Sequence, residues 1–454
     1  MSNDSDALVF FGATGDLAHK KIFPSLHALV ARGALDVPVI GVAKAGWDLE
    51  RLKQRARESI ERHDDALDKL LSLLRYVDGD YDDDATFVAL REQLGAARRP
   101  LHYLAIPPSL FGEVVQALQR NGCADDARVV VEKPFGHDLA SARELNRVLH
   151  AVFPESSVFR IDHYLGKEPV ENITYVRFAN TFLEPLLRRE YVDHIQITMA
   201  EAFGVQGRGR FYEEAGAIRD VVQNHLLQVL ALLCMDPPAE HSPEGMRDEK
   251  VRFLRSLRPL GKRDVVRGQF AGYRDEDGVA PDSTVETFVA VRLHADSWRW
   301  AGVPFLIRAG KELKETVTEV DVVLKRPPQR VFDTGGPNRL RFRISPDVGT
   351  TLDVRAKEPG EAMVGRDVSL SVHRQAAEDM EPYERLLGDA LHGDQSLFAR
   401  QDTVEAAWEI VDGVLDDATP VHPYDPGCWG PAEADGLLPR GAAWHDPEAE
   451  GGRP

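Results

Sequence analysis

The pattern of hydrophobic and polar positions changes along the chain near residue 190. In the first 150 residues, short apolar runs alternate with longer segments whose apolar positions recur at helical spacing, such as Leu49 to Leu74. The apolar runs are ALVFF (7–11), VPVIGVA (37–43), LHYLAIP (101–107) and ARVVVEKP (127–134). Buried parallel strands that are connected by helices have this pattern. It predicts an α/β, doubly wound dinucleotide-binding domain at the N-terminus.

Beyond residue 190 the apolar runs become rich in β-branched residues or alternate partly with polar residues, as half-buried antiparallel strands do. They are HIQITMAEAFG (194–204), VETFVAVRLHA (285–295), TEVDVVLKR (318–326), RLRFRIS (339–345) and DVSLSVHR (367–374). One long helix is predicted over residues 216–235. We therefore expect two domains, over residues 1–155 and 156–454, the second an α+β domain with a large, mainly antiparallel sheet.

Composition narrows the classes of partner. The chain has 454 residues, of which 43% are hydrophobic and 28% charged, and a formal net charge of -19. Such a chain can bury a large core, but it repels polyanions, so we expect neither nucleic acid nor an anionic membrane surface as a partner. An acidic substrate needs a local basic pocket.

The three cysteines, Cys123, Cys234 and Cys428, are widely spaced and form no CxxC pair, which argues against a disulfide framework and a zinc site. The N-terminal residues are acidic and precede only a very short apolar run, unlike a secretion signal. These features predict a cytoplasmic protein.

The segment GATGDLAHKK (12–21) follows the first predicted strand and places Gly12 and Gly15 in a G-x-x-G arrangement. Glycines allow the backbone to approach a pyrophosphate, and the helix that follows stabilises its charge, although a plain tight turn has the same pattern. The second strand ends in GVAKAG, so Lys44 stands near the position where NAD-binding domains usually carry a carboxylate. A lysine there suits a 2′-phosphate; the alternative is a solvent-exposed lysine.

Two further segments carry candidate chemistry. RIDHYLGKE (160–168) gathers acidic, basic and aromatic residues around a glycine, but a solvated surface could have the same composition. In the predicted helix 216–235, a projection of 100° per residue places Asp220, Asn224 and Gln228 on one polar line and His225 on an apolar face. A histidine in that position is usually a core residue.

Taken together, these segments resemble the glucose-6-phosphate dehydrogenase family. Its signature Asp-His-Tyr-Leu-Gly-Lys followed by Glu, Gln or Lys is matched without a gap by Asp162 to Glu168. The resemblance extends in order over nearly the whole chain, through FGATGDLAHKKIFPSL, YLAIPP, EKPFG, RFAN, EAFGVQGRGRFY, RDVVQNHLLQ, RAGK, YERLLGDA and VEAAWEIVD. It implies NADP-dependent oxidation of glucose 6-phosphate at C1 to 6-phosphoglucono-1,5-lactone, the first oxidative step of the pentose phosphate pathway.

The resemblance also implies roles for individual residues. His225 would be the general base that takes the proton of the C1 hydroxyl, and Asp162 would orient its imidazole. The implied substrate-binding residues are Lys133, His163, Tyr164, Lys167, Glu201, Asp220 and Lys311. The implied cofactor-binding residues are Gly12, Thr14, Gly15, Asp16, Leu17, Lys44, Tyr103 and Lys133. Hydride transfer with a base and a positioned nicotinamide requires no metal.

Three positions depart from the pattern of many members. Lys44 stands where many members have an arginine, so a single ammonium charge replaces the bidentate contact of a guanidinium group with a 2′-phosphate. The sequence EPLLRRE (184–190) replaces a segment that carries a Trp-Asn pair in some members. Ser345 replaces a glutamine that some members have near the substrate. The alternatives are a dehydrogenase of another hexose or amino-sugar phosphate and a silent nucleotide-binding regulatory paralogue. A homodimer or homotetramer is expected.

Overall fold

The computed structural model describes residues 4–240, 242–329, 331–332, 335–373 and 380–447. Within these ranges, no helix is long and apolar enough to cross a membrane. The chain forms two compact units, and each has its own sheet. The first comprises Met1–Lys167, His241–Arg247 and Asp379–Glu405, and the second Glu168–Glu240, Asp248–Glu378 and Ala406–Pro454. The division at residue 155 stays a prediction, to which the structure adds two later segments in the first unit.

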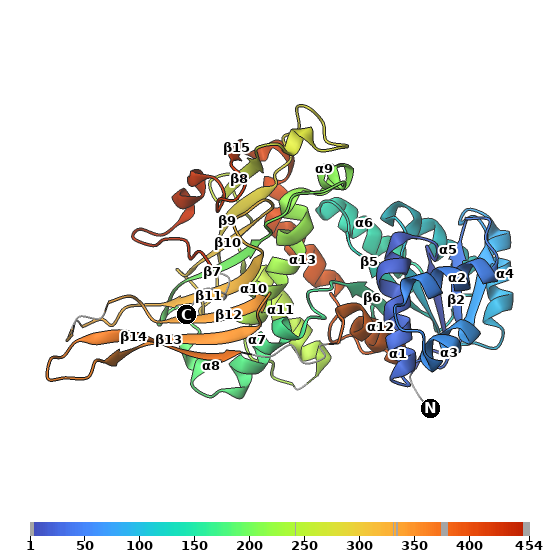
Figure 1. The fold of residues 1–454 in the computed structure, drawn as a ribbon, viewed down its shortest axis with the longest axis horizontal. Coiled ribbons are helices and arrows are strands. Elements are labelled where there is room, and N and C mark those ends of the chain that lie inside the picture. The colour runs from blue at the N-terminus through green and yellow to red at the C-terminus, as the bar shows by residue number, and fades with distance from the viewer. Residues whose placement is uncertain (1–3, 241, 330, 333–334, 374–379, 448–454) are drawn as a thin grey trace. The chain divides into compact units, whose positions relative to one another are not determined.

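The sheet of the first unit has six parallel strands among the described residues, in the order β3-β2-β1-β4-β5-β6. Figure 1 labels β2, β5 and β6 of this sheet. Their bounds are β1 Ala7–Phe11, β2 Val39–Ala43, β3 Leu74–Asp78, β4 Pro100–Leu104, β5 Arg128–Glu132 and β6 Val158–Ile161. The chain starts in the middle of the sheet and winds outward in both directions. This order confirms the predicted doubly wound fold, in which ligands bind beyond the carboxyl ends of the strands.

Helices cover both faces of this sheet, because successive side chains of a strand point to opposite sides. The helices are α1 Phe23–Ala31, α2 Leu49–Ser59, α3 Asp65–Leu73, α4 Asp84–Leu94, α5 Phe111–Arg120, α6 Leu139–His150 and α12 Pro382–His392. Phe10 of β1 packs edge-to-face on Phe23 of α1, whereas Phe11 stacks on Phe87 of α4. The buried cluster around Phe10 also contains Leu386 of α12, so the late segment completes this core.

The sheet of the second unit has nine strands among the described residues, in the order β14-β13-β12-β11-β7-β10-β9-β8-β15. The bounds are β7 Val192–Ala200, β8 Val265–Phe270, β9 Phe288–His294, β10 Pro304–Gly310, β11 Val317–Leu324, β12 Arg339–Ser345, β13 Gly349–Lys357, β14 Gly365–His373 and β15 Val421–Tyr424. Only the neighbours β7/β10 and β8/β15 are parallel within these described strands. The predicted large, mainly antiparallel sheet is confirmed.

The second unit also contains α-helices and a π-helix. They are α7 Glu168–Ala179, α8 Leu183–Leu186, α9 Gly209–Ala217, the π-helix η4 Ile218–Leu226 and α10 Leu227–Cys234; α11 Pro243–Ser256 and α13 Gln401–Val411 contain residues of both units. The prediction of one regular helix over 216–235 is wrong at its start. Gly216 has non-helical dihedral angles (φ 61°, ψ 175°), and the wider π-helical turn invalidates a projection of 100° per residue over 218–226.

Candidate active site

The turn that follows β1 is shaped for close approach of the backbone. Gly12 has φ +79°, and a Cβ atom there would lie 2.2 Å from the carbonyl oxygen of Ala105, so only glycine fits. The N–H of Gly15 donates to the carbonyl of Gly12 at 3.0 Å and closes the turn. The π-helix η1 (Ala18–Ile22) begins directly afterwards. The strand, turn and helix that the sequence predicts are therefore present.

The other predicted residues of this turn differ in exposure. Thr14 and Leu17 are partly buried, and Leu17 packs against the core of the first unit. Asp16 is exposed and forms ion pairs with Lys20 at 3.3 Å and Arg55 at 3.8 Å. Its carboxylate is thus balanced by nearby cations, which reduces its repulsion of a phosphate.

Lys44 follows β2 and lies beside two carboxylates at the end of β3. Its ammonium forms an ion pair with Asp80. Asp78 accepts hydrogen bonds from the backbone N–H groups that follow Lys44, those of Ala45 at 3.0 Å and Gly46 at 2.9 Å. These bonds, that from Ala45 above all, lower the pKa of Asp78. The position after β2 therefore offers an ammonium group that already has an anionic partner.

The carboxyl end of β5 carries Glu132, and Lys133 follows it. The Glu132 carboxylate accepts hydrogen bonds from the hydroxyl groups of Tyr103 and Tyr383. Burial raises the pKa of Glu132 to about 7, against the opposing effect of these donors. Tyr103 is fully buried in β4, so its side chain belongs to the core; its contact with a cofactor stays a prediction.

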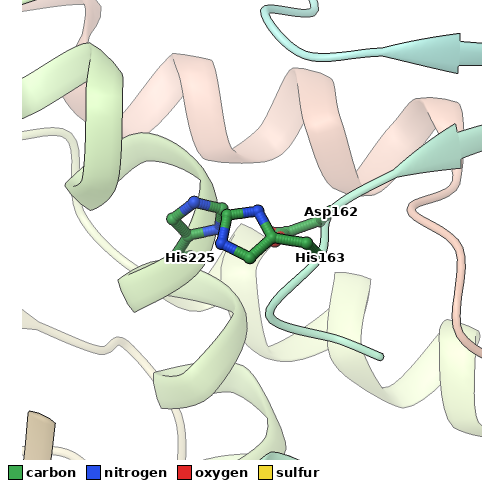
Figure 2. A group of neighbouring side chains, drawn as sticks. All are labelled: Asp162, His163 and His225. Atoms are coloured by element: carbon green, nitrogen blue, oxygen red, sulfur yellow. The ribbon is translucent and has the colours of Figure 1, made fainter. Parts of the chain in front are cut away.

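Asp162 and His163 follow β6 directly (Figure 2). Asp162 is buried, and its Oδ1 accepts the backbone N–H of Tyr164 at 2.9 Å. The carbonyl of Asp162 accepts the N–H of Leu165 at 2.9 Å, which starts a tight turn. The turn fixes the carboxylate at the carboxyl end of a strand, where ligands of this fold bind.

The aromatic and basic side chains of the same turn contact one another. The Lys167 ammonium lies 3.8 Å from the centre of the Tyr164 ring, and the His163 and Tyr164 rings pack edge-to-face at 5.3 Å. The backbone N–H of Lys167 donates to the carbonyl of Tyr164 at 3.1 Å. The structure therefore brings the predicted phosphate-binding residues together, within one short turn of the first unit.

In the second unit, His225 and Asp220 lie on the π-helix η4; Figure 2 shows His225 on this helix. His225 is almost completely buried, and its backbone N–H donates to Oδ1 of Asn224 at 2.5 Å. The amide of Asn224 donates to the carbonyl of Arg219, five residues earlier, at 3.2 Å. These side-chain bonds support the wide turn, and π-helical turns are frequent at functional sites.

A buried carboxylate fixes the start of η4. Oε1 of Glu286 accepts the N–H of Ile218 at 3.0 Å, and its backbone carbonyl accepts the N–H of Ala217 at 3.0 Å. Arg267, also buried, donates to the other carboxylate oxygen of Glu286 at 3.2 Å. The negative charge at the helix N-terminus is favourable for the helix dipole. Gly216 makes this approach possible, because a Cβ atom there would lie 2.5 Å from Oε1 of Glu286.

Glu201 and Lys311 directly follow the carboxyl ends of the parallel strands β7 and β10. Their side chains form an ion pair at 2.5 Å. The Tyr424 hydroxyl donates to the carbonyl of Lys311 at 2.6 Å, and the ammonium of Lys311 lies 5.0 Å from the centre of the Phe203 ring. The ammonium group is therefore held over an aromatic ring and against a carboxylate.

Asp220 belongs to the same neighbourhood of the second unit. Burial raises the pKa of Tyr212 well above its ordinary value, and the negative charges of Asp220 and Glu201 raise it further. The Lys311 ammonium lies 5.8 Å from the centre of the Tyr212 ring. The charges of the predicted sugar-binding residues Glu201 and Asp220 therefore act on one buried tyrosine, whose ring also lies near the Lys311 ammonium.

The sequence reasoning missed several residues that shape these sites. They are Asp78, Asp80, Tyr81, Gly216, Glu286 and Tyr383. The acidic run after β3 could have signalled Asp78 and Asp80, since carboxyl ends of neighbouring parallel strands meet at one edge. No sequence signal links Glu286 to residue 218, because the contact depends on the tertiary fold.

Comparison with known proteins supports one family over both units. Residues 9–172 match the NAD binding domain and residues 174–445 the C-terminal domain of glucose-6-phosphate dehydrogenase. Glucose-6-phosphate 1-dehydrogenase 1 of Mycobacterium tuberculosis is 47% identical over 453 residues, which cover 98% of this chain and 97% of that protein.

Two solved structures are similar to this chain over nearly its whole length. The crystal structure of glucose-6-phosphate 1-dehydrogenase from Mycobacterium avium is 46% identical and has a TM-score of 0.92, with 98% of this chain and 99% of that chain covered. A structure of glucose-6-phosphate dehydrogenase in complex with its substrate glucose-6-phosphate is 35% identical, also with a TM-score of 0.92, and covers 98% of this chain and 100% of the other. The chain belongs to the glucose-6-phosphate dehydrogenase family.

Proposed function

We propose that this chain oxidises glucose 6-phosphate at C1 to 6-phosphoglucono-1,5-lactone, with NADP as the preferred hydride acceptor. The observation that carries the proposal is the likeness, at 35% identity over 98% of the chain, to a dehydrogenase solved with glucose 6-phosphate as its substrate. The side chains that this reaction needs are all present, from the Asp162 turn to the Lys311–Glu201 pair. Their presence argues against a silent regulatory paralogue.

His225 acts as the general base in this proposal. Its imidazole takes the proton of the C1 hydroxyl while the hydride leaves C1, and a bound nicotinamide supplies the hydride acceptor. Asp162 pairs with the imidazole, holds the productive tautomer and stabilises the imidazolium that forms. The burial of both side chains supports this role, because a charge pair is stronger where water is excluded.

The substrate is held by two groups of residues. His163, Tyr164 and Lys167 bind the sugar phosphate with charge-assisted and neutral hydrogen bonds. The Lys311–Glu201 pair and Asp220 bind sugar hydroxyls, which can accept a hydrogen bond from the ammonium and donate one to a carboxylate. Lys133, after β5, contacts both substrate and cofactor.

The cofactor lies over the turn after β1. Gly12, Gly15 and the N–H groups that follow them receive the pyrophosphate, with Thr14, Asp16 and Leu17 in the same turn. Lys44 attracts the 2′-phosphate of NADP, which makes NADP the preferred cofactor.

We also propose that the chain forms a homodimer or homotetramer and is located in the cytoplasm. The outer strand β14 has exposed apolar side chains on one face, Leu370 at 57% and Val372 at 75%, and a second copy would cover such a face. Light scattering of the purified chain measures this state, and a monomer at micromolar concentration would contradict it.

One assay separates the proposed activity from its alternatives. Absorbance of the reduced nicotinamide is followed with glucose 6-phosphate, free glucose, other hexose 6-phosphates and glucosamine 6-phosphate, each with NADP and with NAD. We expect glucose 6-phosphate to have the highest kcat/KM, and free glucose to be a poor substrate because the phosphate-binding residues stay empty. A higher kcat/KM for another sugar phosphate would establish a dehydrogenase of that sugar phosphate. Absence of turnover with every sugar would indicate a silent nucleotide-binding regulatory paralogue.

A further inference from the structure

The cofactor-facing end of β3 carries an acidic segment that holds the loop after β2. We call residues 78–81, Asp-Gly-Asp-Tyr, the acidic clasp. Asp80 forms an ion pair with the ammonium of Lys44, whose side chain is 70% exposed. Asp78 accepts the N–H groups of Ala45, Gly46 and, at 3.4 Å, Trp47. Both carboxylates therefore face the loop that would surround the 2′ position of a cofactor.

The position of Asp80 is fixed by its own backbone and neighbours. Its Oδ1 accepts the N–H of Tyr81 at 2.9 Å, and its carbonyl accepts the hydroxyl of Thr86 at 2.7 Å. A Cβ atom at Gly79 would lie 2.2 Å from that hydroxyl, so the close contact requires glycine. Asp80 is thus part of an ordered turn.

The clasp is also tied to the phosphate-binding turn. The hydroxyl of Tyr81 accepts the N–H of Gly12 at 2.9 Å and donates to the carbonyl of Val42 at 3.2 Å. One tyrosine therefore joins the carboxyl ends of β1, β2 and β3. This connection links the segment that carries Asp80 to the turn that would receive a pyrophosphate.

Charge decides which cofactor this arrangement favours. A 2′-phosphate is anionic, so its approach to Lys44 competes with the carboxylate of Asp80 for the same ammonium and is opposed by the charge of Asp78. The 2′-hydroxyl of NAD is neutral and can donate a hydrogen bond to a carboxylate, as it does in NAD-binding domains.

We propose that Asp80 is a specificity-determining residue that lowers the preference of this chain for NADP over NAD by competing for Lys44. The inference rests on the proposed function, since it concerns the choice of its cofactor. It places the control of specificity on the segment after β3, one strand beyond the position at the end of β2 that usually sets it.

The test compares kcat/KM for NADP and for NAD, at saturating glucose 6-phosphate, in the wild type, Asp80→Asn, Lys44→Ala and the double variant. Asparagine keeps an oxygen for the N–H of Tyr81 and removes the charge. Because an exposed ion pair is weak, Asp80→Asn is expected to raise kcat/KM for NADP about two- to fivefold and to leave the value for NAD unchanged or lower. In the Lys44→Ala background this gain is expected to shrink, since no ammonium remains to compete for and only the direct repulsion between the carboxylate and the 2′-phosphate is removed.

Two controls sharpen the comparison. Asp36→Asn removes the acidic partner of Lys69, an exposed ion pair of 3.0 Å in the same unit, and should change neither value. Asp80→Ser, which also keeps an acceptor for Tyr81, replaces Asp80→Asn if the latter does not fold. Equal changes for NADP and NAD, a loss for NADP, or a gain of the same size without Lys44 would overturn the proposal.

Calorimetric titration of the sugar-free protein with NADP and NAD separates failure of the inference from failure of the proposed function. Without turnover of glucose 6-phosphate by any variant, the proposed function fails, yet the titration still compares the two cofactors. Tighter binding of NADP by Asp80→Asn, by the same factor, supports the role of Asp80. Unchanged binding contradicts it.

Discussion

Gly216→Ala tests how the start of the π-helix η4 holds Asp220 and His225. Gly216 has φ 61° and ψ 175°, a conformation that side chains other than glycine rarely adopt. A Cβ atom would also lie 2.5 Å from Oε1 of Glu286, the oxygen that accepts the N–H of Ile218. Alanine therefore strains the backbone and displaces a buried carboxylate.

The magnitude follows from these two effects. The backbone strain costs about 1 to 3 kcal/mol, and weakening the charged hydrogen bond to Ile218 costs a similar amount, so a loss of about 2 to 6 kcal/mol in the free energy of unfolding is expected. Such a loss is a large part of the stability of an ordinary domain. The shifted helix start also misplaces His225, so kcat should fall at temperatures where the variant remains folded.

Urea unfolding followed by circular dichroism measures the first effect, and steady-state turnover of glucose 6-phosphate the second. Gly302→Ala is the matched control, because Gly302 has φ +86° but no atom within 4 Å of the added Cβ. The control loses only about 1 to 2 kcal/mol from strain and keeps its kcat. Equal unfolding midpoints and equal kcat values for the two variants would refute the role assigned to Glu286.

Two further predictions concern the first unit. Lys167→Ala should raise KM for glucose 6-phosphate about 10- to 100-fold, because a charged hydrogen bond to the phosphate is lost. Lys69→Ala is the control. An unchanged KM in Lys167→Ala would contradict the role of Lys167 in phosphate binding. His102 is fully buried, and desolvation lowers its pKa from 6.5 to about 4, so it stays neutral in the folded state while the unfolded chain takes up a proton below pH 6.5. The free energy of unfolding should therefore fall by up to about 3 kcal/mol as the pH drops from 6.5 towards 4. Urea titrations at both pH values should show a smaller fall for His102→Gln. An equal fall in the wild type and the variant would contradict the role of His102.

Local patterns predicted the sheets better than the helices. The run ALVFF coincides with β1 and RLRFRIS with β12, because apolar or alternating runs are set by burial on a sheet. The helix over 216–235 was predicted from apolar spacing alone. Its first turns depart from that prediction because Gly216 and the buried Glu286 fix a start that depends on tertiary contacts.

In the candidate site, local sequence likewise identified residues of one segment but not contacts between separate segments. The segment 162–167 is one local turn, so its members could be identified together from the sequence. Lys44 was also identified, but its ion pair with Asp80 joins two loops and could not be read from either. Tyr103 lies in the core, where its hydroxyl bonds to Glu132, and its contact with a cofactor stays a prediction.

The turnover number of His225→Asn with glucose 6-phosphate and NADP tests the central claim most directly. Asparagine removes the base, and the phosphate-binding residues lie on a different segment, so binding of both ligands should persist in calorimetric titration. We predict that kcat falls about 10²- to 10⁴-fold, the usual effect of removing a general base. A folded His225→Asn variant that binds both ligands and keeps a near-normal kcat would contradict His225 as the base.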